Sequence, residues 1–221
     1  MNIKRMINMD GLYGKLFKAL KERNKEEAVK ISLEALEKER IDVIGLYEGI
    51  LSPILKNVVE EYKDESMLIW QEHVRSEIVT SIIENTYLNV LKERDKKGLA
   101  KGKKVMVLCP KFEEHIIGSR MARDIFTIAG YETIFIGANT PWETVLKAIE
   151  IKKPEFISIS VTNFYNIIET KRTIKEIKNV FGYGIKFILA GNAFKRSKET
   201  YKEIGGDIYL ESLKDIFSLE R

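Results

Sequence analysis

Two histidines occur in the chain, and each stands close behind a glutamate. His115 lies in the segment Glu-Glu-His-Ile-Ile-Gly, two residues after Glu113 and three residues before Gly118. An imidazole can ligate a metal through one ring nitrogen while a carboxylate at the other nitrogen fixes its tautomer and raises its basicity. The sequence thus raises the question of what His115 coordinates or titrates beside Glu113, and Gly118 would let a bulky group approach the helix start. The second histidine, His73, directly follows Glu72.

Simpler interpretations of these residues stay open at the level of sequence. His115 could be a helix-terminal histidine that is satisfied by Glu113 alone. Cys109 could join these two residues in a zinc or iron site, although three ligands in one loop are few for such a site. Glu72 and His73 could form a solvated or core pair on a helix.

Helical periodicity dominates the first ninety residues. Apolar residues recur at three- and four-residue spacing in four segments, near 12–20, 28–36, 46–58 and 66–91. Asp42 is expected to cap the third helix and Pro53 to bend it. Short connections favour an antiparallel four-helix bundle over residues 1–92. The polar, basic segment 93–104 is expected to be a solvated linker.

From residue 105 onwards, short apolar runs alternate with helical segments, which predicts a parallel, doubly wound sheet over residues 105–221. The expected strands are 105–108, 133–136, 156–160, 187–190 and 208–210. The expected helices are near 115–129, 142–151, 167–180, 195–203 and 213–219. The fold class is thus α/β with an all-α N-terminal domain. Because ligands bind at the carboxyl ends of such strands, the loops of interest are 109–118, 137–141, 160–166 and 191–195.

Composition and missing motifs exclude several function classes. The net charge of +4, with 32% charged residues, is too balanced to predict direct nucleic-acid binding. No Gly-x-Gly-x-x-Gly, Walker A or serine nucleophile-elbow motif occurs. The single cysteine rules out an internal disulfide and fits a reducing compartment. No signal-peptide or membrane-length apolar run occurs, so we expect a cytoplasmic protein without a membrane partner.

Three loops of the second half carry residues at the spacing of a known signature. They are Glu113-x-His115-x-x-Gly118 after the first strand, Ser160-x-Thr162 after the third, and Gly191-Asn192 after the fourth. This pattern resembles the Asp-x-His-x-x-Gly, Ser-x-Leu and Gly-Gly motifs of the cobalamin-binding domain family. Glu113, Thr162 and Asn192 depart from the usual residues. The resemblance implies a flavodoxin-like cobalamin-binding domain preceded by a helical cap bundle.

The resemblance also implies roles for these residues. His115 would ligate cobalt, and Glu113 would fix its tautomer from behind. The nucleotide tail of cobalamin would be buried in the α/β domain, in a pocket formed by Gly118, Ser160, Thr162, Gly191 and Asn192. The chemistry would belong to the cofactor, so no catalytic residue of the protein itself is expected.

The helical half resembles one branch of this family. Tyr62, nine further residues and then Glu72-His73 are similar to the Trp-x9-Glu-His motif of light-responsive cobalamin regulators of the CarH/LitR type. In that group these residues are implied to cover the upper face of adenosylcobalamin, and Trp70 lies on the same helix face as His73. The loop 137–141 is similar to that group's Gly-Ala-Asp-Thr-Pro. The resemblance implies a photoreceptor or cobalamin sensor that prefers adenosylcobalamin to methylcobalamin.

Two further functions and several partners are left open by the sequence. No MerR-type DNA-binding domain is recognisable, so a sensor would act on transcription through a partner regulator, with or without homo-oligomerisation. The alternative is a corrinoid methyl carrier whose partner is a methyltransferase. Because a carrier needs no histidine over the upper ligand, His73 separates the two. A third interpretation is a degenerate family member that binds haem or a tetrapyrrole precursor.

Overall fold

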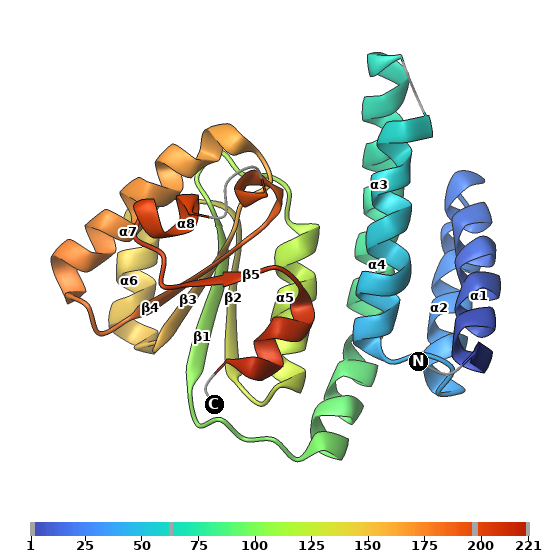
Figure 1. Ribbon diagram of the computed structural model, residues 1–221, viewed down its shortest axis with the longest axis horizontal. Helices are drawn as coiled ribbons and strands as arrows, with labels where there is room; N and C mark the ends of the chain where they lie inside the picture. The colour runs from blue at the N-terminus through green and yellow to red at the C-terminus, as the bar shows by residue number, and fades with distance from the viewer. Residues whose placement is uncertain (1–2, 62–63, 196–198, 220–221) are drawn as a thin grey trace. The chain divides into compact units, whose positions relative to one another are not determined.

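The computed structural model describes residues 3–61, 64–195 and 199–219. The chain forms two compact units, a helical unit (residues 1–93) and an α/β unit (residues 94–221). The helical elements are α1 (Ile3–Lys21), α2 (Lys25–Glu37), the π-helical segment η1 (Gly45–Leu51), α3 (Ser52–Glu61) and α4 (Glu65–Lys97) (Figure 1). Within the described ranges, no helix has both the length and the apolar character that a membrane crossing requires.

The third predicted helix is interrupted as its sequence suggests. Asp42 accepts a hydrogen bond from the Gly45 N–H at 2.9 Å, as expected of a cap. Pro53 lacks an N–H to continue the normal helical ladder, and the turns before it widen into the π-helical segment η1, where the Ser52 N–H donates to the Tyr47 carbonyl. The bend expected at Pro53 is therefore a local change of helix type between η1 and α3.

Helix α4 runs further than the sequence indicated. It continues to Lys97, into the segment predicted as a linker, so only residues 98–103 separate it from the first strand. Arg94, Lys96 and Lys97 occupy its last turn, where positive charge interacts favourably with the helix dipole. This interaction explains why a basic segment without apolar periodicity stays helical.

A buried arginine of the helical unit forms an ion pair with a partly exposed glutamate. Arg75 of α4 is fully buried and donates from Nη2 to Glu61 Oε2 at 2.8 Å. Its guanidinium carbon lies 6.0 Å from the centre of the Phe17 ring, and Lys21 forms an ion pair with the other oxygen of Glu61. Burial raises the pKa of Glu61, but hydrogen bonds from Lys21 and Arg75 outweigh it, so the net shift of this pKa is downward. The carboxylate is thereby held in its charged form.

The α/β unit contains the predicted parallel sheet. Its strands are β1 (Lys104–Pro110), β2 (Glu132–Thr140), β3 (Phe156–Ser160), β4 (Lys186–Ala190) and β5 (Ile208–Leu210). They lie side by side in the order β2-β1-β3-β4-β5, with every neighbouring pair parallel. The five-stranded, flavodoxin-like doubly wound sheet expected from the sequence is confirmed.

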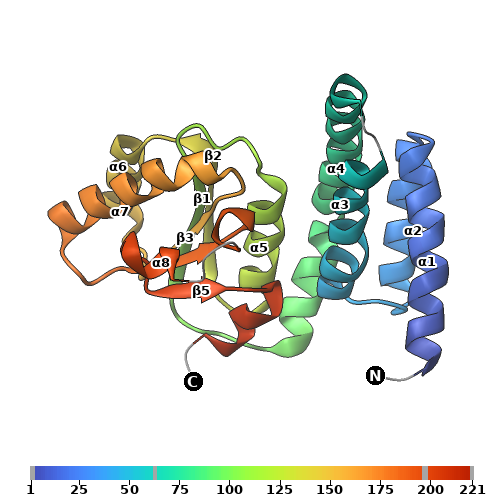
Figure 2. The ribbon, with the colours of Figure 1, turned by 45° about the horizontal axis from the view of Figure 1, so that its top comes forward.

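Helices cover both faces of this sheet (Figures 1 and 2). The long ones are α5 (Ile117–Ile128) on one face, and α6 (Trp142–Lys152) and α7 (Ile167–Phe181) on the other. The short ones are η2 (Phe164–Asn166), η3 (Asn192–Phe194), α8 (Thr200–Glu203) and η4 (Leu213–Ser218). Buried apolar side chains of the central strands and of α6 and α7 form one core, including Leu108, Ile157, Ile159, Ile174, Phe187 and Leu189.

The start of α5 differs from the sequence prediction. The helix begins at Ile117, so His115 lies in the preceding loop rather than in the first helical turn. Two local hydrogen bonds stabilise the conformation of this loop. The Glu113 N–H donates to the Pro110 carbonyl, and the His115 N–H donates to the Glu113 carboxylate. The last predicted helix is also different, since η4 is a 3-10 helix.

The strand order creates a topological switch point at β1. After β1 the chain forms β2 on one side, and later returns to form β3 on the other side. The loops that follow β1 and β3 therefore separate at the carboxyl edge of the sheet, which is where such folds bind ligands. Residues 111–116 and 161–166 are these loops.

Candidate functional site

Glu113 joins the two loops at the switch point. Its Oε1 lies 2.6 Å from His115 Nδ1. Its Oε2 accepts hydrogen bonds from the backbone N–H groups of Thr162 and Asn163, both at 2.9 Å, and from Asn166 Nδ2 at 3.1 Å. The carboxylate is fully buried, so each of these bonds compensates for lost hydration. The longer glutamate side chain thus reaches the loop after β3 and the histidine at the same time.

Hydrogen bonding keeps this carboxylate ionised. Burial by itself raises the pKa of Glu113, but the hydrogen bonds from His115, from the Asn163 N–H and from Asn166 outweigh that effect. The pKa of Glu113 is lowered to about 2. A negative charge therefore stands behind the imidazole at every physiological pH.

His115 combines a fixed ring nitrogen with an accessible side chain. The carboxylate of Glu113 holds a proton on Nδ1, so Nε2 carries the lone pair that a metal ligand needs. The side chain is 57% exposed although its partner is fully buried. His115 lies two residues before the start of α5, and its contact with Glu113 is also the one that the simpler, helix-terminal interpretation expects. An oriented, accessible imidazole backed by a buried carboxylate can ligate a metal that enters from outside the domain.

Gly118 and the Ser160 hydroxyl face each other across α5 and the end of β3. A side chain at Gly118, in the first turn of α5, would place its Cβ 3.6 Å from Ser160 Oγ at the end of β3. Apart from its chain neighbours and the backbone of the same helix, no other atom would lie within 4 Å of this Cβ. Glycine at this position therefore keeps the space in front of the Ser160 hydroxyl open. Thr162 contributes its backbone N–H to Glu113 rather than a side-chain contact.

The packing of two loops explains why position 191 is a glycine. Its φ is +113°, and a Cβ at this position would lie 2.2 Å from the Val161 carbonyl oxygen. That same oxygen accepts a hydrogen bond from the Ala193 N–H, so the loops after β3 and β4 pack backbone to backbone here. Asn192 is exposed and begins η3. The close packing of these two loops requires a residue without a side chain at position 191.

We expect Gly191→Ala to destabilise the α/β unit more than Gly182→Ala does. Both glycines have positive φ, but a Cβ at Gly182 would meet no atom within 4 Å, whereas one at Gly191 would collide with backbone. Such backbone strain alone costs about 1–3 kcal/mol, and the collision adds to it only at Gly191. Urea denaturation followed by Trp142 fluorescence in a Trp70→Phe background measures the difference. Equal costs for the two variants would contradict the packing explanation.

The predicted upper-face residues belong to the helical unit. Tyr62 lies outside the described residues. Trp70 is 39% exposed, its indole N–H lies 3.3 Å from Met67 Sδ, and the Arg23 guanidinium lies 5.2 Å from its ring centre. Trp70 is therefore not a buried core residue.

The Glu72–His73 pair lies on the surface of α4. His73 is 73% exposed, and its Nε2 is 3.7 Å from Glu72 Oε2. The other carboxylate oxygen of Glu72 accepts a hydrogen bond from Ser76 Oγ at 2.6 Å. This arrangement is typical of a solvated helix surface.

Cys109 is a buried thiol at the end of β1. Its Sγ lies 3.3 Å from Ser119 Oγ and 3.7 Å from the His115 carbonyl oxygen. Burial raises the pKa of this thiol to about 11 despite the hydrogen bond to Ser119. A neutral thiol is a poor metal ligand, and the described part of the chain holds no group of three or more His, Cys, Asp or Glu residues suited to a metal ion. The zinc or iron interpretation is therefore unsupported.

Cys109 should resist thiol reagents in the folded protein. At pH 8 a pKa of about 11 leaves roughly one hundredth of the thiolate of an unburied cysteine, and burial restricts access further. We expect no reaction with Ellman's reagent over minutes in native buffer and one equivalent per chain in 6 M guanidinium chloride. Rapid stoichiometric reaction of the native protein would contradict the described burial.

Two asparagines at this edge were not recognised from sequence. Asn166 is only 7% exposed, and its Nδ2 donates to Glu113 Oε2 and to the Phe112 carbonyl oxygen at 3.2 Å. Asn139, at the end of β2, accepts a hydrogen bond from the Phe112 N–H. Their positions in the segments 160–166 and 137–141 were the available signal, since these segments end β3 and β2, the two strands that flank β1.

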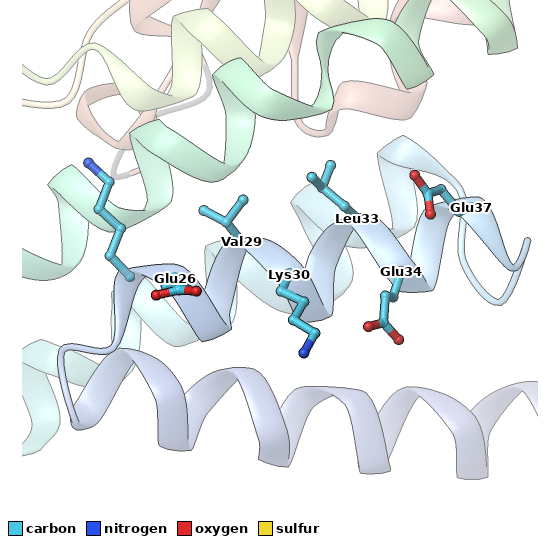
Figure 3. A pocket seen from close by; sticks show the side chains of 7 residues that line it. Glu26, Val29, Lys30, Leu33, Glu34 and Glu37 are labelled. Atoms are coloured by element: carbon cyan, nitrogen blue, oxygen red, sulfur yellow. The ribbon is translucent and has the colours of Figure 1, made fainter.

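A surface hollow occurs elsewhere, along α2 (Figure 3). It is lined by Lys25, Glu26, Val29, Lys30, Leu33, Glu34 and Glu37. Val29 and Leu33 give it an apolar floor. None of these residues is a histidine, cysteine or buried carboxylate, so the hollow lacks the groups that the switch point brings together.

Comparison with known proteins identifies the family and the fold. Two family models, each described as a B12 binding domain, match residues 103–215 and residues 12–86. No curated protein sequence matches the chain. The structure is similar to that of a monomethylamine corrinoid protein from Methanosarcina barkeri, with a TM-score of 0.81 and 16% sequence identity over 95% of this chain and 97% of the other. It also resembles a cobalamin-binding protein from Desulfitobacterium hafniense DCB-2, with a TM-score of 0.50 and 15% identity over 94% and 96% of the two chains.

At these low identities the structural similarities establish the fold, an all-helical part followed by a flavodoxin-like sheet. Nothing in them links the chain to light-responsive regulators of the CarH/LitR type. The family models add the ligand class, because one covers the whole sheet region and the other covers most of the helical unit. The chain therefore belongs to the B12 binding domain family.

Proposed function

We propose that this protein is a corrinoid carrier, which holds cobalamin through His115 and presents it to a methyltransferase. The observation that carries the proposal is the Glu113–His115 pair, with an exposed imidazole fixed at 2.6 Å by a buried carboxylate. The carrier is favoured over the sensor by the structural similarity, over nearly the full length of both chains, to a protein described as a monomethylamine corrinoid protein.

The residues of this site fit cobalamin. A neutral imidazole is a suitable nitrogen ligand for cobalt, and Glu113 holds the proton on Nδ1 that leaves Nε2 for the metal. Gly118 adds no side chain in front of the Ser160 hydroxyl, where a Cβ would lie 3.6 Å from Ser160 Oγ. We propose that the nucleotide tail enters between α5 and the end of β3, with Ser160 and Thr162 beside it.

The protein's own residues would orient and retain the cofactor. Bound cobalamin supplies the cobalt that accepts and gives up a methyl group. Glu113 raises the basicity of the imidazole, and the donors from Thr162, Asn163 and Asn166 hold Glu113 in place.

The sensor interpretation lacks a supporting observation. It depended on Tyr62, Trp70, Glu72 and His73, of which Tyr62 is outside the described residues. His73 and Glu72 form an exposed pair on α4. A transcription-regulator partner and a preference for adenosylcobalamin depended on the same resemblance. In the carrier proposal the partner is a methyltransferase, and the working form of the cofactor is methylcobalamin.

Loading experiments test cobalamin binding and its form together. The purified protein is incubated with hydroxo-, methyl- or adenosylcobalamin in the dark, desalted, and examined by absorption spectroscopy. We expect retention of about one cobalamin per chain, a spectrum with the intrinsic base displaced by histidine, and similar affinities for the methyl and adenosyl forms. Absence of retained cobalamin at micromolar protein would overturn the proposal.

Illumination and methyl transfer separate a carrier from a sensor. For a carrier, size-exclusion profiles and limited proteolysis of the adenosylcobalamin complex should be the same in the dark and after green light. The methylcobalamin complex should transfer its methyl group to a thiol when a corrinoid-dependent methyltransferase is added. A light-dependent change in oligomeric state, with strong preference for adenosylcobalamin, would instead establish the sensor.

A further inference from the structure

Two residues beside the site have backbone conformations that are rare for their types. Phe112, directly before Glu113, has φ +68°, and Asn139, at the end of β2, has φ +49°. Asparagine tolerates the left-handed region better than most residues, but a bulky aromatic residue there is an outlier. Such strain persists only where surrounding contacts hold it, and it concentrates at functional sites.

Two hydrogen bonds tie Asn139 to the backbone of Phe112 and Glu113. The Phe112 N–H donates to Asn139 Oδ1 at 2.8 Å. In the other direction, the Asn139 N–H donates to the Glu113 carbonyl oxygen at 3.0 Å. One asparagine therefore binds both ends of the Phe112–Glu113 unit, with its side chain on one residue and its backbone on the next.

The same unit is held from the opposite side of the switch point. Asn166 donates to the Phe112 carbonyl oxygen at 3.2 Å and to Glu113 Oε2 at 3.1 Å. The backbone that carries Glu113 is thus fixed between the end of β2 and the start of α7. Because His115 is oriented through Glu113, any rotation of this backbone would move the carboxylate away from Nδ1.

We propose that Asn139 is a positioning residue for His115, which acts by holding the strained Phe112–Glu113 backbone so that the Glu113 carboxylate stays on Nδ1. The inference rests on the proposed role of His115 as the cobalt ligand, and it adds a residue on β2 to a site otherwise built from the loops after β1 and β3. Asn139 itself is exposed and contacts neither His115 nor Gly118.

Three substitutions separate the two properties of Asn139, its side-chain acceptor for the Phe112 N–H and its tolerance of positive φ. Asn139→Asp keeps an acceptor for the Phe112 N–H and tolerates positive φ. Asn139→Gly keeps the backbone conformation but removes the acceptor, and Asn139→Ala removes the acceptor and disfavours positive φ. Asn179→Ala is the matched control, because Asn179 is an exposed asparagine of α7 whose side chain only reaches Glu176.

The first measurement uses the protein without cofactor. Nitrogen-15 NMR of the imidazole rings reports which nitrogen carries the proton, and with only two histidines in the chain a His73→Gln variant assigns the signals. In the wild type, in Asn139→Asp and in Asn179→Ala we expect His115 predominantly protonated on Nδ1. In Asn139→Gly and Asn139→Ala we expect a mixture of tautomers while the circular dichroism spectrum stays unchanged.

A purely structural role for Asn139 gives a different result. It would lower the midpoint of thermal unfolding without changing the His115 tautomer, and that result overturns the inference. Should Asn139→Ala fail to fold, Asn139→Gly decides alone, since glycine accepts the backbone conformation. An Asn139→Asp variant that behaves like Asn139→Gly would also contradict the inference, because the acceptor would then be irrelevant.

A second measurement distinguishes this inference from the proposed function. Absorption spectroscopy measures the affinity for hydroxocobalamin in the same variants. Asn139→Gly should weaken this affinity by about tenfold, the low end of the effects seen when a residue that hydrogen-bonds to a metal ligand is removed. If the wild type binds no cobalamin but the tautomer still depends on Asn139, the positioning role stands and the proposed function fails. If cobalamin binds and the tautomer is insensitive to Asn139, the positioning role fails alone.

Discussion

Replacing His115 by alanine should abolish the spectrum of histidine-ligated cobalamin and weaken cobalamin binding severely. The substitution removes the nitrogen ligand itself, so we expect a loss larger than the roughly 10- to 100-fold caused by removing a group behind a metal ligand. Absorption spectroscopy of the hydroxocobalamin complex and equilibrium dialysis measure both effects. A His115→Ala complex with the wild-type spectrum and affinity would show that cobalt is ligated elsewhere.

Glu113 and Glu114 offer a matched pair of control substitutions. Glu113→Gln keeps the length of the side chain but removes the charge and places an amide among hydrogen-bond donors, so we expect about 10- to 100-fold weaker binding. Glu114→Gln removes an exposed charge one residue away and should leave binding unchanged. A similar effect of the two substitutions would indicate a general electrostatic contribution rather than the Glu113–His115 pair.

Arg75→Ala should destabilise the helical unit by about 2–5 kcal/mol, the usual cost of deleting a large, fully buried side chain and leaving a cavity. Arg75 is fully buried, and its loss removes a 2.8 Å bond to Glu61 and its contact with the Phe17 ring. Arg75→Met should cost less, because methionine fills much of the space and Lys21 still pairs with Glu61. Urea denaturation followed by Trp70 fluorescence in a Trp142→Phe background reports on this unit.

An exposed ion pair in the same unit serves as the control. Lys18, in the last turn of α1, lies 3.8 Å from Glu22, which directly follows the helix, and both side chains are largely exposed. Lys18→Ala should change the free energy of unfolding by less than about 0.5 kcal/mol. If Arg75→Ala costs no more than Lys18→Ala, the buried arrangement of Arg75 does not exist in solution.

The arrangement of strands and helices could be predicted from the sequence because it depends on local patterns. Short apolar runs with turn residues between them identified all five strands, and their alternation with helices required parallel pairing. Errors concentrated at element ends, where local pattern is weakest. The start of α5 after His115 and the extension of α4 to Lys97 were both missed, because each depends on specific hydrogen bonds or end charges rather than on periodicity.

The pairing of Glu113 with His115 was also predictable, because two residues at i and i+2 in one loop can meet without knowledge of the rest of the chain. What fixes the pair was not predictable. The Asn166 side chain and the backbone N–H groups of residues 162 and 163 lie about 50 positions from Glu113 in the sequence. Asn139, at the end of β2, lies 27 positions from its partner Phe112.

The sequence by itself thus determined the sheet, the helical half and the meeting of Glu113 with His115, since each follows from spacing along the chain. Only the tertiary structure decided that Gly191 serves the packing of two loops, that Arg75 lies in the interior of the helical unit, and which donors hold Glu113. Those properties depend on which loops meet at the topological switch point and which helix faces pack together. Contacts of that kind join residues whose separation in sequence carries no periodic signal.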